Sequence, residues 1–134
     1  MAPPNIVVVS DSLETQQAFA SVLGQWGLAP ILAPTACEAE AILNRHHVSL
    51  IFCSDELPSD GIDGLIRQTR RPQNKVPVVM VSRLDDWHCY LNFLQLGAFD
   101  YILYPPCGNE IERIVKNALG FVQPNRVQQV VAAS

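Results

Sequence analysis

The stretch that decides the fold class is residues 49–58, Ser-Leu-Ile-Phe-Cys-Ser-Asp-Glu-Leu-Pro. Its apolar residues, 50–53, are continuous rather than alternating, which is the pattern of a strand buried on both faces. The run ends abruptly at Ser54 and is followed by two acids and a proline. Strands covered on both sides occur almost only in parallel sheets flanked by helices. The stretch therefore predicts a central strand with a polar loop at its carboxyl end.

Similar apolar runs occur on both sides of this stretch. Residues 6–9 and 76–81 are rich in valine, as buried strands are, and the weaker run 28–33 contains Pro30, which suits an edge strand. A fifth run covers residues 99–103. The sequence thus predicts strands at 6–9, 28–33, 49–54, 76–81 and 99–103.

Helical patterns lie between these runs. Thr35 and Glu38 have the spacing of a capping box, whereas Pro58, Ser59, Asp60 and Gly61 are typical of a loop. Helices are expected at residues 13–26, 36–46, 64–71, 85–96 and 109–122. Strict alternation of strand and helix predicts a parallel sheet with right-handed crossovers and helices on both faces.

Composition restricts the class of protein. The 134 residues suit one domain, and a hydrophobic content of 49% argues against disorder. A net charge of −4 disfavours nucleic-acid binding by this domain. No apolar run approaches the roughly 20 residues of a membrane span. These features predict a soluble, cytoplasmic protein.

The cysteines do not have the spacing of a metal or disulfide framework. They are far apart and form no Cys-x-x-Cys pair: Cys37, Cys53, Cys89 and Cys107. We interpret them as buried thiols in a reducing compartment.

Polar residues gather at the predicted carboxyl ends of the strands. In parallel α/β sheets these ends line the ligand crevice. The residues expected there are Ser10 and Asp11, Ser54 and Asp55, Ser82, and Tyr104. We call these six the crevice residues.

Three motifs occur in order around these positions. Residues 50–58 are followed by Asp63 and Gly64; residues 76–82 end in a hydroxyl residue; residues 96–105 read Leu-Gly-Ala-Phe-Asp-Tyr-Ile-Leu-Tyr-Pro. Together they resemble the receiver domain of bacterial two-component response regulators, over residues 5–122. The resemblance implies a flavodoxin-like (CheY-like), doubly wound α/β sandwich with a five-stranded parallel sheet and five helices. It also implies a phosphorelay signalling domain rather than an enzyme, with a histidine kinase, an output domain or a second copy as protein partner.

Some of the family's functional positions are retained. Ser82 matches the family's hydroxyl residue, and Tyr101 matches its switch aromatic. Pro105 matches the proline of the family's Lys-Pro pair, whose peptide bond is usually cis. The resemblance therefore implies a cis bond between Tyr104 and Pro105, and such bonds occur chiefly before proline.

Other positions depart from the pattern. The acidic pair after the first strand is Ser10 and Asp11, the phosphoacceptor position, four residues before Pro58, is Ser54, and the lysine position is Tyr104. Mg²⁺ prefers carboxylates and other hard oxygen ligands, so a site left with Asp11 is expected to bind it weakly, if at all; no other cofactor is expected.

A serine also needs a neighbouring base to act as a nucleophile. The resemblance therefore implies a pseudo-receiver without normal aspartate phosphorylation. The alternative is a working Mg²⁺-dependent receiver in which a one-residue bulge or a register change turns Asp55 into the crevice.

The predicted helix 85–96 has two apolar stripes. One contains Cys89, Phe93 and Leu96, and the resemblance implies that it faces the sheet. The other contains Trp87, Tyr90, Leu91 and Leu94. A helix on one face of a sheet buries a single stripe, so the second is expected either to bind a partner or to be covered by the chain's own loops or tail.

Residues 1–122 are expected to form the receiver domain, and residues 123–134 a C-terminal tail or linker. In a third interpretation the chain is the regulatory domain of a longer protein, with that segment leading to an output domain.

Overall fold

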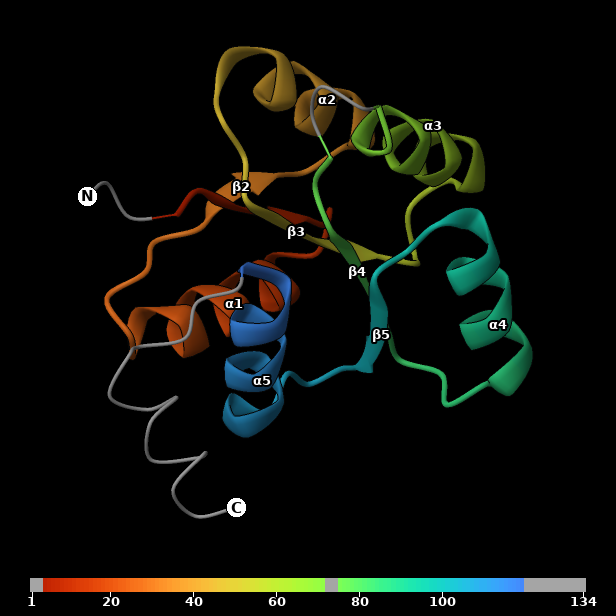
Figure 1. The fold of residues 1–134 in the computed structure, drawn as a ribbon. Helices are drawn as coiled ribbons and strands as arrows, with labels where there is room; N and C mark the ends of the chain where they lie inside the picture. Colours follow the sequence, from red (N-terminus) through yellow and green to blue (C-terminus); the bar gives the residue numbers. More distant parts are fainter. Residues whose placement is uncertain (1–3, 72–74, 120–134) are drawn as a thin grey trace, which may run out of the picture.

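The computed structural model describes residues 4–71 and 75–119. Within them strands and helices alternate along the chain (Figure 1). In order they are β1 (Ile6–Val9), α1 (Leu13–Gly24), β2 (Ile31–Ala33), α2 (Ala36–Arg45), β3 (Leu50–Ser54), α3 (Ser59–Thr69), β4 (Val78–Ser82), α4 (Trp87–Leu96), β5 (Asp100–Leu103) and α5 (Gly108–Leu119).

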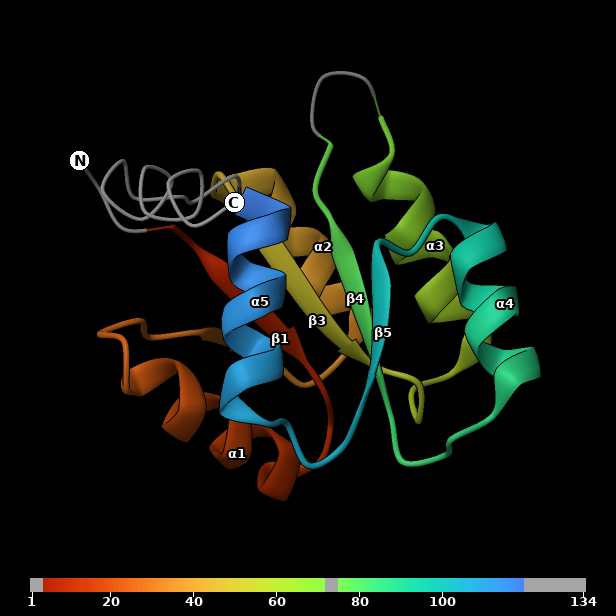
Figure 2. The same cartoon turned by 60° about the horizontal axis from the view of Figure 1, so that its bottom comes forward.

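The five strands form one parallel sheet in the order β2-β1-β3-β4-β5. This is the predicted flavodoxin-like sandwich, and β2, the strand with a proline just before it, lies at an edge as expected. The register aligns the strand ends, because Val9 pairs with Cys53, and Ser54 with Val81. Figure 2 shows the loops that follow β3, β4 and β5 gathered at one end of the sheet.

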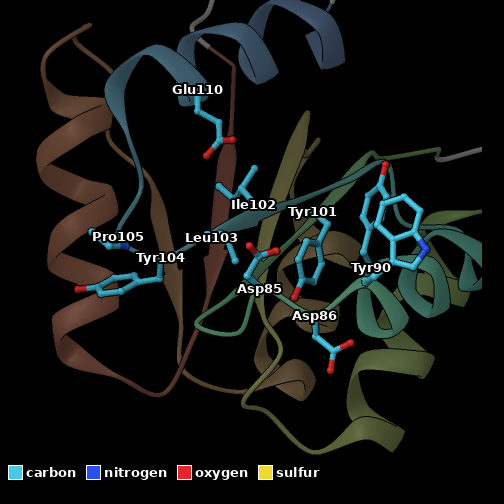
Figure 3. Close-up of a pocket in the computed structure, with 10 residues that line it drawn as sticks. Asp85, Asp86, Tyr90, Tyr101, Ile102, Leu103, Tyr104, Pro105 and Glu110 are labelled. Atoms are coloured by element: carbon cyan, nitrogen blue, oxygen red, sulfur yellow. The ribbon is translucent and has the colours of Figure 1, made fainter.

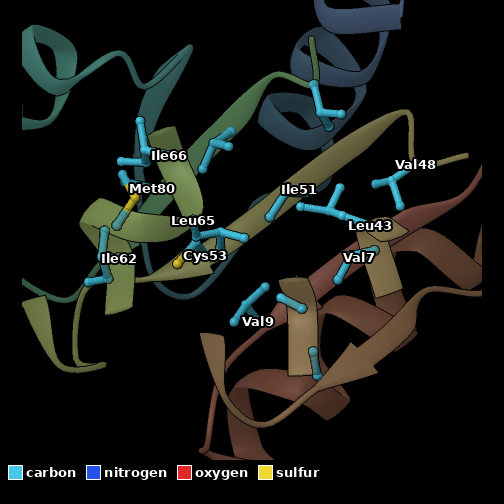
Figure 4. Packing of buried hydrophobic residues seen from close by; sticks show 14 of the residues in the cluster. Val7, Val9, Leu43, Val48, Ile51, Cys53, Ile62, Leu65, Ile66 and Met80 are labelled. Carbon is cyan, nitrogen blue, oxygen red and sulfur yellow. The ribbon is translucent and has the colours of Figure 1, made fainter. Parts of the chain in front are cut away.

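The alternation of side chains in β1 and β3 builds a core on each face. Val7 and Ile51 pack with α2 and α3 (Figure 4), whereas Val8 and Phe52 pack with α1 and α5. The rings of Phe52 and Phe19 lie 4.9 Å apart between centroids. Every residue of β1, β3 and β4 is buried, which explains why these strands are continuous apolar runs.

Side-chain caps set the starts of three described helices, and at α4 the Asp86 carboxylate accepts a hydrogen bond from the amide of His88. The Ser12 side chain accepts a hydrogen bond from the amide of Thr15, and the Thr35 side chain accepts one from the amide of Glu38. Each bond satisfies an amide that has no partner within its helix. The cap predicted at Thr35 is therefore present.

The start of α3 differs from the prediction. The helix begins at Ser59, directly after Pro58, and not at residue 64. The amides of Gly61 and Ile62 both donate to the carbonyl oxygen of Pro58, and Ile62 is buried. Burial of that side chain outweighs the low helix propensity of the glycine in the first turn.

The remaining bounds differ by a few residues. Helix α1 ends at Gly24 rather than residue 26, and β2 begins at Ile31 rather than residue 28. Residues 120–122 of the expected last helix, and the expected tail 123–134, lie outside the described residues.

The expectation of buried cysteines is wrong for most of them. Cys53 is buried, but Cys37 and Cys107 are exposed and Cys89 is half-buried. Cys53 lies in the central strand, whereas Cys37 and Cys107 lie in or beside helix starts at the surface. In the part of the chain that the structure describes, no helix has the length and apolar character needed to cross a bilayer.

Candidate functional site

Three buried serines end neighbouring strands and share one arrangement. The hydroxyl oxygens of Ser10, Ser54 and Ser82 each accept a hydrogen bond from the amide two residues ahead, at 3.1, 3.2 and 3.0 Å. All three residues are at most 4% exposed. Such short loops are the usual local hydrogen bonds of serine. The hydroxyls therefore shape the loops that follow β1, β3 and β4.

The two crevice carboxylates lie in different surroundings. Asp11 is exposed, and the described residues offer it no hydrogen bond or ion pair. Asp55 is half-buried, and its amide donates to the carbonyl oxygen of Val81 at 3.0 Å. The ladder between β3 and β4 therefore continues in regular register to the end of β3, without the bulge that the alternative interpretation invoked.

Asp55 shares its face of the sheet with Cys53 rather than with Ser54. Burial raises the pKa of the Asp55 carboxyl and Glu56 adds to the rise, while the Ser82 hydroxyl and the backbone lower it. Burial, and then the charge of Asp55, raises the pKa of the Cys53 thiol to about 12. The Asp55 carboxylate is thus partly withdrawn from water beside Ser82.

A cation that the sequence analysis did not foresee lies beside the crevice residues. The guanidinium of Arg83, in the β4–α4 loop, lies 3.5 Å from a carboxylate oxygen of Glu14 and 3.3 Å from one of Glu56. Its central carbon lies 4.1 Å from the centroid of the Tyr104 ring. The Tyr104 hydroxyl donates to Glu14 at 2.8 Å. We call these four residues the Arg83 network.

The neighbouring Tyr101 is tied to the same loop. Its hydroxyl donates to the carbonyl oxygen of Leu84 at 2.6 Å, and its ring packs against the rings of Tyr90 and Phe93. Figure 3 shows Tyr101 on the α4 side of β5, whereas Tyr104 extends toward α1. The peptide bond between Tyr104 and Pro105 is cis, as the resemblance implied.

A groove of about 570 Å³ lies between α4, β5 and α5 (Figure 3). Aromatic and apolar side chains meet carboxylates in it, and the lining contains no lysine or arginine. The residues that line it are Asp85, Asp86, Trp87, Tyr90, Tyr101, Ile102, Leu103, Tyr104, Pro105 and Glu110.

The two stripes of α4 are only partly separated. Trp87 and Leu91 are 66% and 38% exposed, whereas Tyr90 and Leu94 are half-buried. Phe93 packs against the core, but Leu96, which was expected to face the sheet, is 41% exposed. Leu96 ends the helix just before Gly97, at the point where the chain turns away into β5.

The donor set at the crevice does not fit a magnesium site. Of its two carboxylates, Asp11 is exposed and Asp55 is half-buried beside Ser82, while the Ser10 and Ser54 oxygens accept hydrogen bonds from backbone amides. Glu14 and Glu56 are paired with Arg83. The described ranges contain no cluster of three or more His, Cys, Asp or Glu side chains that could hold a metal ion.

The model of one protein family, the response regulator receiver domain, matches residues 6–116. The chain belongs to this family. The match spans every strand and all but the last three residues of α5. The predicted family and fold class are therefore confirmed.

Similar proteins agree with this assignment. The probable transcriptional regulator ycf27 of Porphyridium aerugineum is 29% identical over 120 residues, which cover 89% of this chain and 49% of that protein. The transcriptional regulatory protein PmrA of Pectobacterium parmentieri is 28% identical, over 83% of this chain and 50% of its own length. This receiver chain spans about half the length of these curated relatives.

Solved structures support the same fold. The crystal structure of a response regulator from Thermotoga maritima superposes with a TM-score of 0.78 at 28% identity, covering 89% of this chain and 99% of that one. The chain is thus similar to response regulators in sequence and in fold.

Proposed function

We propose that this receiver domain is a pseudo-receiver, which transmits a signal through protein contacts without phosphorylation of an aspartate. The observation that carries the proposal is the chemistry at the end of β3. The residue there, at the family's phosphoacceptor position, is Ser54, whose buried hydroxyl accepts a hydrogen bond from the Glu56 amide. A serine hydroxyl needs a base to attack a phosphoryl group, and the described residues place no imidazole or carboxylate in hydrogen-bonding contact with it.

The surroundings of Ser54 support the same proposal. Transfer of a phosphoryl group requires cationic groups that face the developing charge. The cation nearest the lysine position is Arg83, and its guanidinium is already paired with Glu14 and Glu56. Any incoming phosphoryl group would have to compete with two carboxylates for it.

The contact surface of the proposed pseudo-receiver lies on α4. Receiver domains interact with histidine kinases or phosphotransfer proteins and with output domains. We assign the contact to Trp87, Tyr90, Leu91 and Leu94, beside the groove along β5, because exposed aromatic residues often anchor interfaces. The partner is a histidine kinase, an output domain or a second copy, met in the cytoplasm, and not a nucleic acid.

We also propose boundaries for the domain. We assign residues 1–122 to the receiver and residues 123–134 to a tail or linker. The family match ends at residue 116, so the tail lies beyond the matched segment.

The alternative function is a working phosphoacceptor that uses Asp55 with Asp11. The half-buried position of the Asp55 carboxylate near Ser82 favours it, because a hydroxyl beside an acceptor carboxylate can bind the transferred group. The regular register of β3 disfavours it, since Asp55 then shares the face of Cys53 and not that of Ser54.

Phosphoryl transfer can be tested directly. The purified chain would be incubated with MgCl₂ and acetyl phosphate, and its intact mass measured after an acid quench. We expect the unmodified mass, under conditions in which an active receiver domain gains one phosphoryl group.

Two variants make the test specific. Modification of the wild type that disappears in Asp55→Asn would overturn the proposal in favour of the alternative. Modification that persists in Asp55→Asn and disappears in Ser54→Ala would identify a serine acceptor and would overturn both.

A further inference from the structure

We propose that Arg83 acts as a built-in clamp, which fixes the β4–α4 loop to the neighbouring strand ends and to α1, and so presets the α4 face without any bound group. The inference deepens the proposed function and rests on it, because a clamp of this kind is needed where no phosphoryl group arrives to organise the loop. It assigns Arg83 a positioning role.

The clamp joins three other segments to one loop. Glu14 lies in the first turn of α1, Glu56 follows β3, and Tyr104 follows β5. From the β4–α4 loop Arg83 reaches both carboxylates, at 3.5 and 3.3 Å, and covers the Tyr104 ring at 4.1 Å. A single side chain therefore connects the loops at the carboxyl ends of β3, β4 and β5 with α1.

Tyr104 closes the network. In addition to the cation–π contact with Arg83, its hydroxyl donates to the same Glu14 carboxylate, across 90 positions of sequence. A planar guanidinium can bind a carboxylate and stack on an aromatic ring at the same time. Because the contacts share members, the loss of one loosens the others.

The clamped loop leads directly to the proposed contact surface. The next residue, Leu84, donates its amide to the Ser82 hydroxyl, and its carbonyl oxygen accepts a hydrogen bond from Tyr101. Tyr101 in turn packs on Tyr90 of α4, at 5.8 Å between ring centroids. Arg83 is thus two contacts from the face that we assign to partner binding.

The strength of the clamp depends on solvent and salt. The side chains of Arg83, Glu14 and Glu56 are 42%, 70% and 52% exposed. Exposed ion pairs are individually weak, but a shared network is stronger than an isolated pair. At an ionic strength of about 1 M the screening length falls to about 3 Å, so concentrated salt is expected to loosen the loop.

Hydrogen exchange at the Leu84 amide reports the clamp directly. In Arg83→Gln we expect this amide to exchange about fivefold faster than in the wild type, since the charge and the ring contact are lost. Wild type in about 1 M NaCl is expected to approach the variant. In Tyr104→Phe, which keeps the ring and loses the bond to Glu14, we expect an intermediate rate.

Arg113→Gln is the matched control. Arg113 is an exposed arginine that pairs with Asp100 and Glu110 on the other side of the groove, so this variant changes the net charge equally. An unchanged Leu84 rate in Arg83→Gln, or equal acceleration in Arg113→Gln, would overturn the clamp. Neither result depends on whether the chain accepts a phosphoryl group, which the mass measurement decides separately.

Discussion

Of the two crevice carboxylates, Asp55 has the surroundings that disfavour its charged form. It is half-buried, next to Glu56 and close to the buried thiol of Cys53. Burial and the neighbouring charge raise the pKa of its carboxyl group. In the folded state this group therefore binds its proton more tightly than it does in the unfolded chain.

A pH-dependent stability follows from this shift. Where the folded-state pKa is raised, the native state binds more protons, so the free energy of unfolding falls as pH rises from the unfolded value near 3.8 through the folded pKa. We expect Asp55→Asn to raise the free energy of unfolding at pH 7 by less than about 1 kcal/mol, because solvent screens a partly exposed group.

Urea unfolding at several pH values would measure this effect. The advantage of the variant should vanish as pH falls below about 3.8, where Asp55 is protonated in both states. Asp11→Asn is the control at an exposed position without a partner, and we expect little change there. A variant less stable than wild type at pH 7 would show that the carboxylate makes a stabilising contact.

At the scale of single elements, helix α4 is followed by a glycine that is favoured both by the backbone conformation and by a close neighbouring side chain. Gly97 has a φ of 115°, and a Cβ atom there would lie 2.6 Å from Cδ of Arg70. Arg70, at the end of α3, donates to the carbonyl oxygen of Leu96. The turn therefore combines a left-handed backbone with close packing against α3.

Gly97→Ala is expected to lower the free energy of unfolding by about 1–2 kcal/mol, from the cost of a left-handed backbone at a residue with a Cβ atom. Urea unfolding would measure the loss. Gly24→Ala is the control at the end of α1, where the added Cβ would lie within 4 Å of no atom other than those of its chain neighbours and of its own helix backbone. Equal stabilities for the two variants would contradict the requirement for glycine at position 97.

A charged substitution in the exposed stripe of α4 tests whether this stripe binds a partner. Trp87 is 66% exposed beside the groove, so we expect Trp87→Glu to weaken dimerisation or partner binding at least tenfold, as loss of an aromatic anchor does. The measurement is light scattering for the dimer and titration calorimetry for a purified kinase or output domain.

Asn92→Glu supplies the matched control for Trp87→Glu, because it adds the same charge to an exposed position of α4. Far-ultraviolet circular dichroism would confirm folding of both variants. Association that persists unchanged in Trp87→Glu would show that the α4 face is not the contact surface.

The start of helix α3 could not be predicted from the local sequence pattern. Pro58, Asp60 and Gly61 have the composition of a loop, but they form the N-cap and first turn of the helix. The deciding factor is tertiary: Ile62 is buried, and the Cβ of Ala36 in α2 lies 3.1 Å from a Cβ built on Gly61. Packing of α2 against α3 is not visible in a local window of sequence.

For the molecule as a whole, β3 lies between β1 and β4, and all three strands contribute side chains to both halves of the core. Phe52 is fully buried and meets Phe19 across the α1 side of the sheet. Phe52→Ala is expected to lower the free energy of unfolding by about 3–5 kcal/mol, as large cavities do. Phe99→Ala, at a residue that is 44% exposed, should cost much less, and thermal unfolding of both variants would compare them.

The sheet could be predicted from sequence because its determinants are local. Runs such as residues 6–9 and 50–53 are apolar throughout, and they predict buried parallel strands without knowledge of their neighbours. The crevice residues followed from the same reasoning, since the carboxyl ends of these strands must meet at one edge.

The Arg83 network could not be predicted in this way. Glu14 and Tyr104 are 90 positions apart, and Arg83 lies 27 positions from Glu56. Each is an ordinary loop or helix-end residue in its own segment. The available signal was their position next to strand ends, which placed one cation among several acids at a single edge of the sheet.

An amide NMR titration with Mg²⁺ and then beryllofluoride tests most directly whether this receiver domain functions without a phosphoryl group. Beryllofluoride stands in for a phosphoryl group on a carboxylate. We predict that the amide signals of Asp11, Ser54, Asp55 and Ser82 stay unchanged throughout the titration. Saturable shifts at these residues that extend to Tyr101 and α4 would contradict the claim and show that Asp55 is a working acceptor.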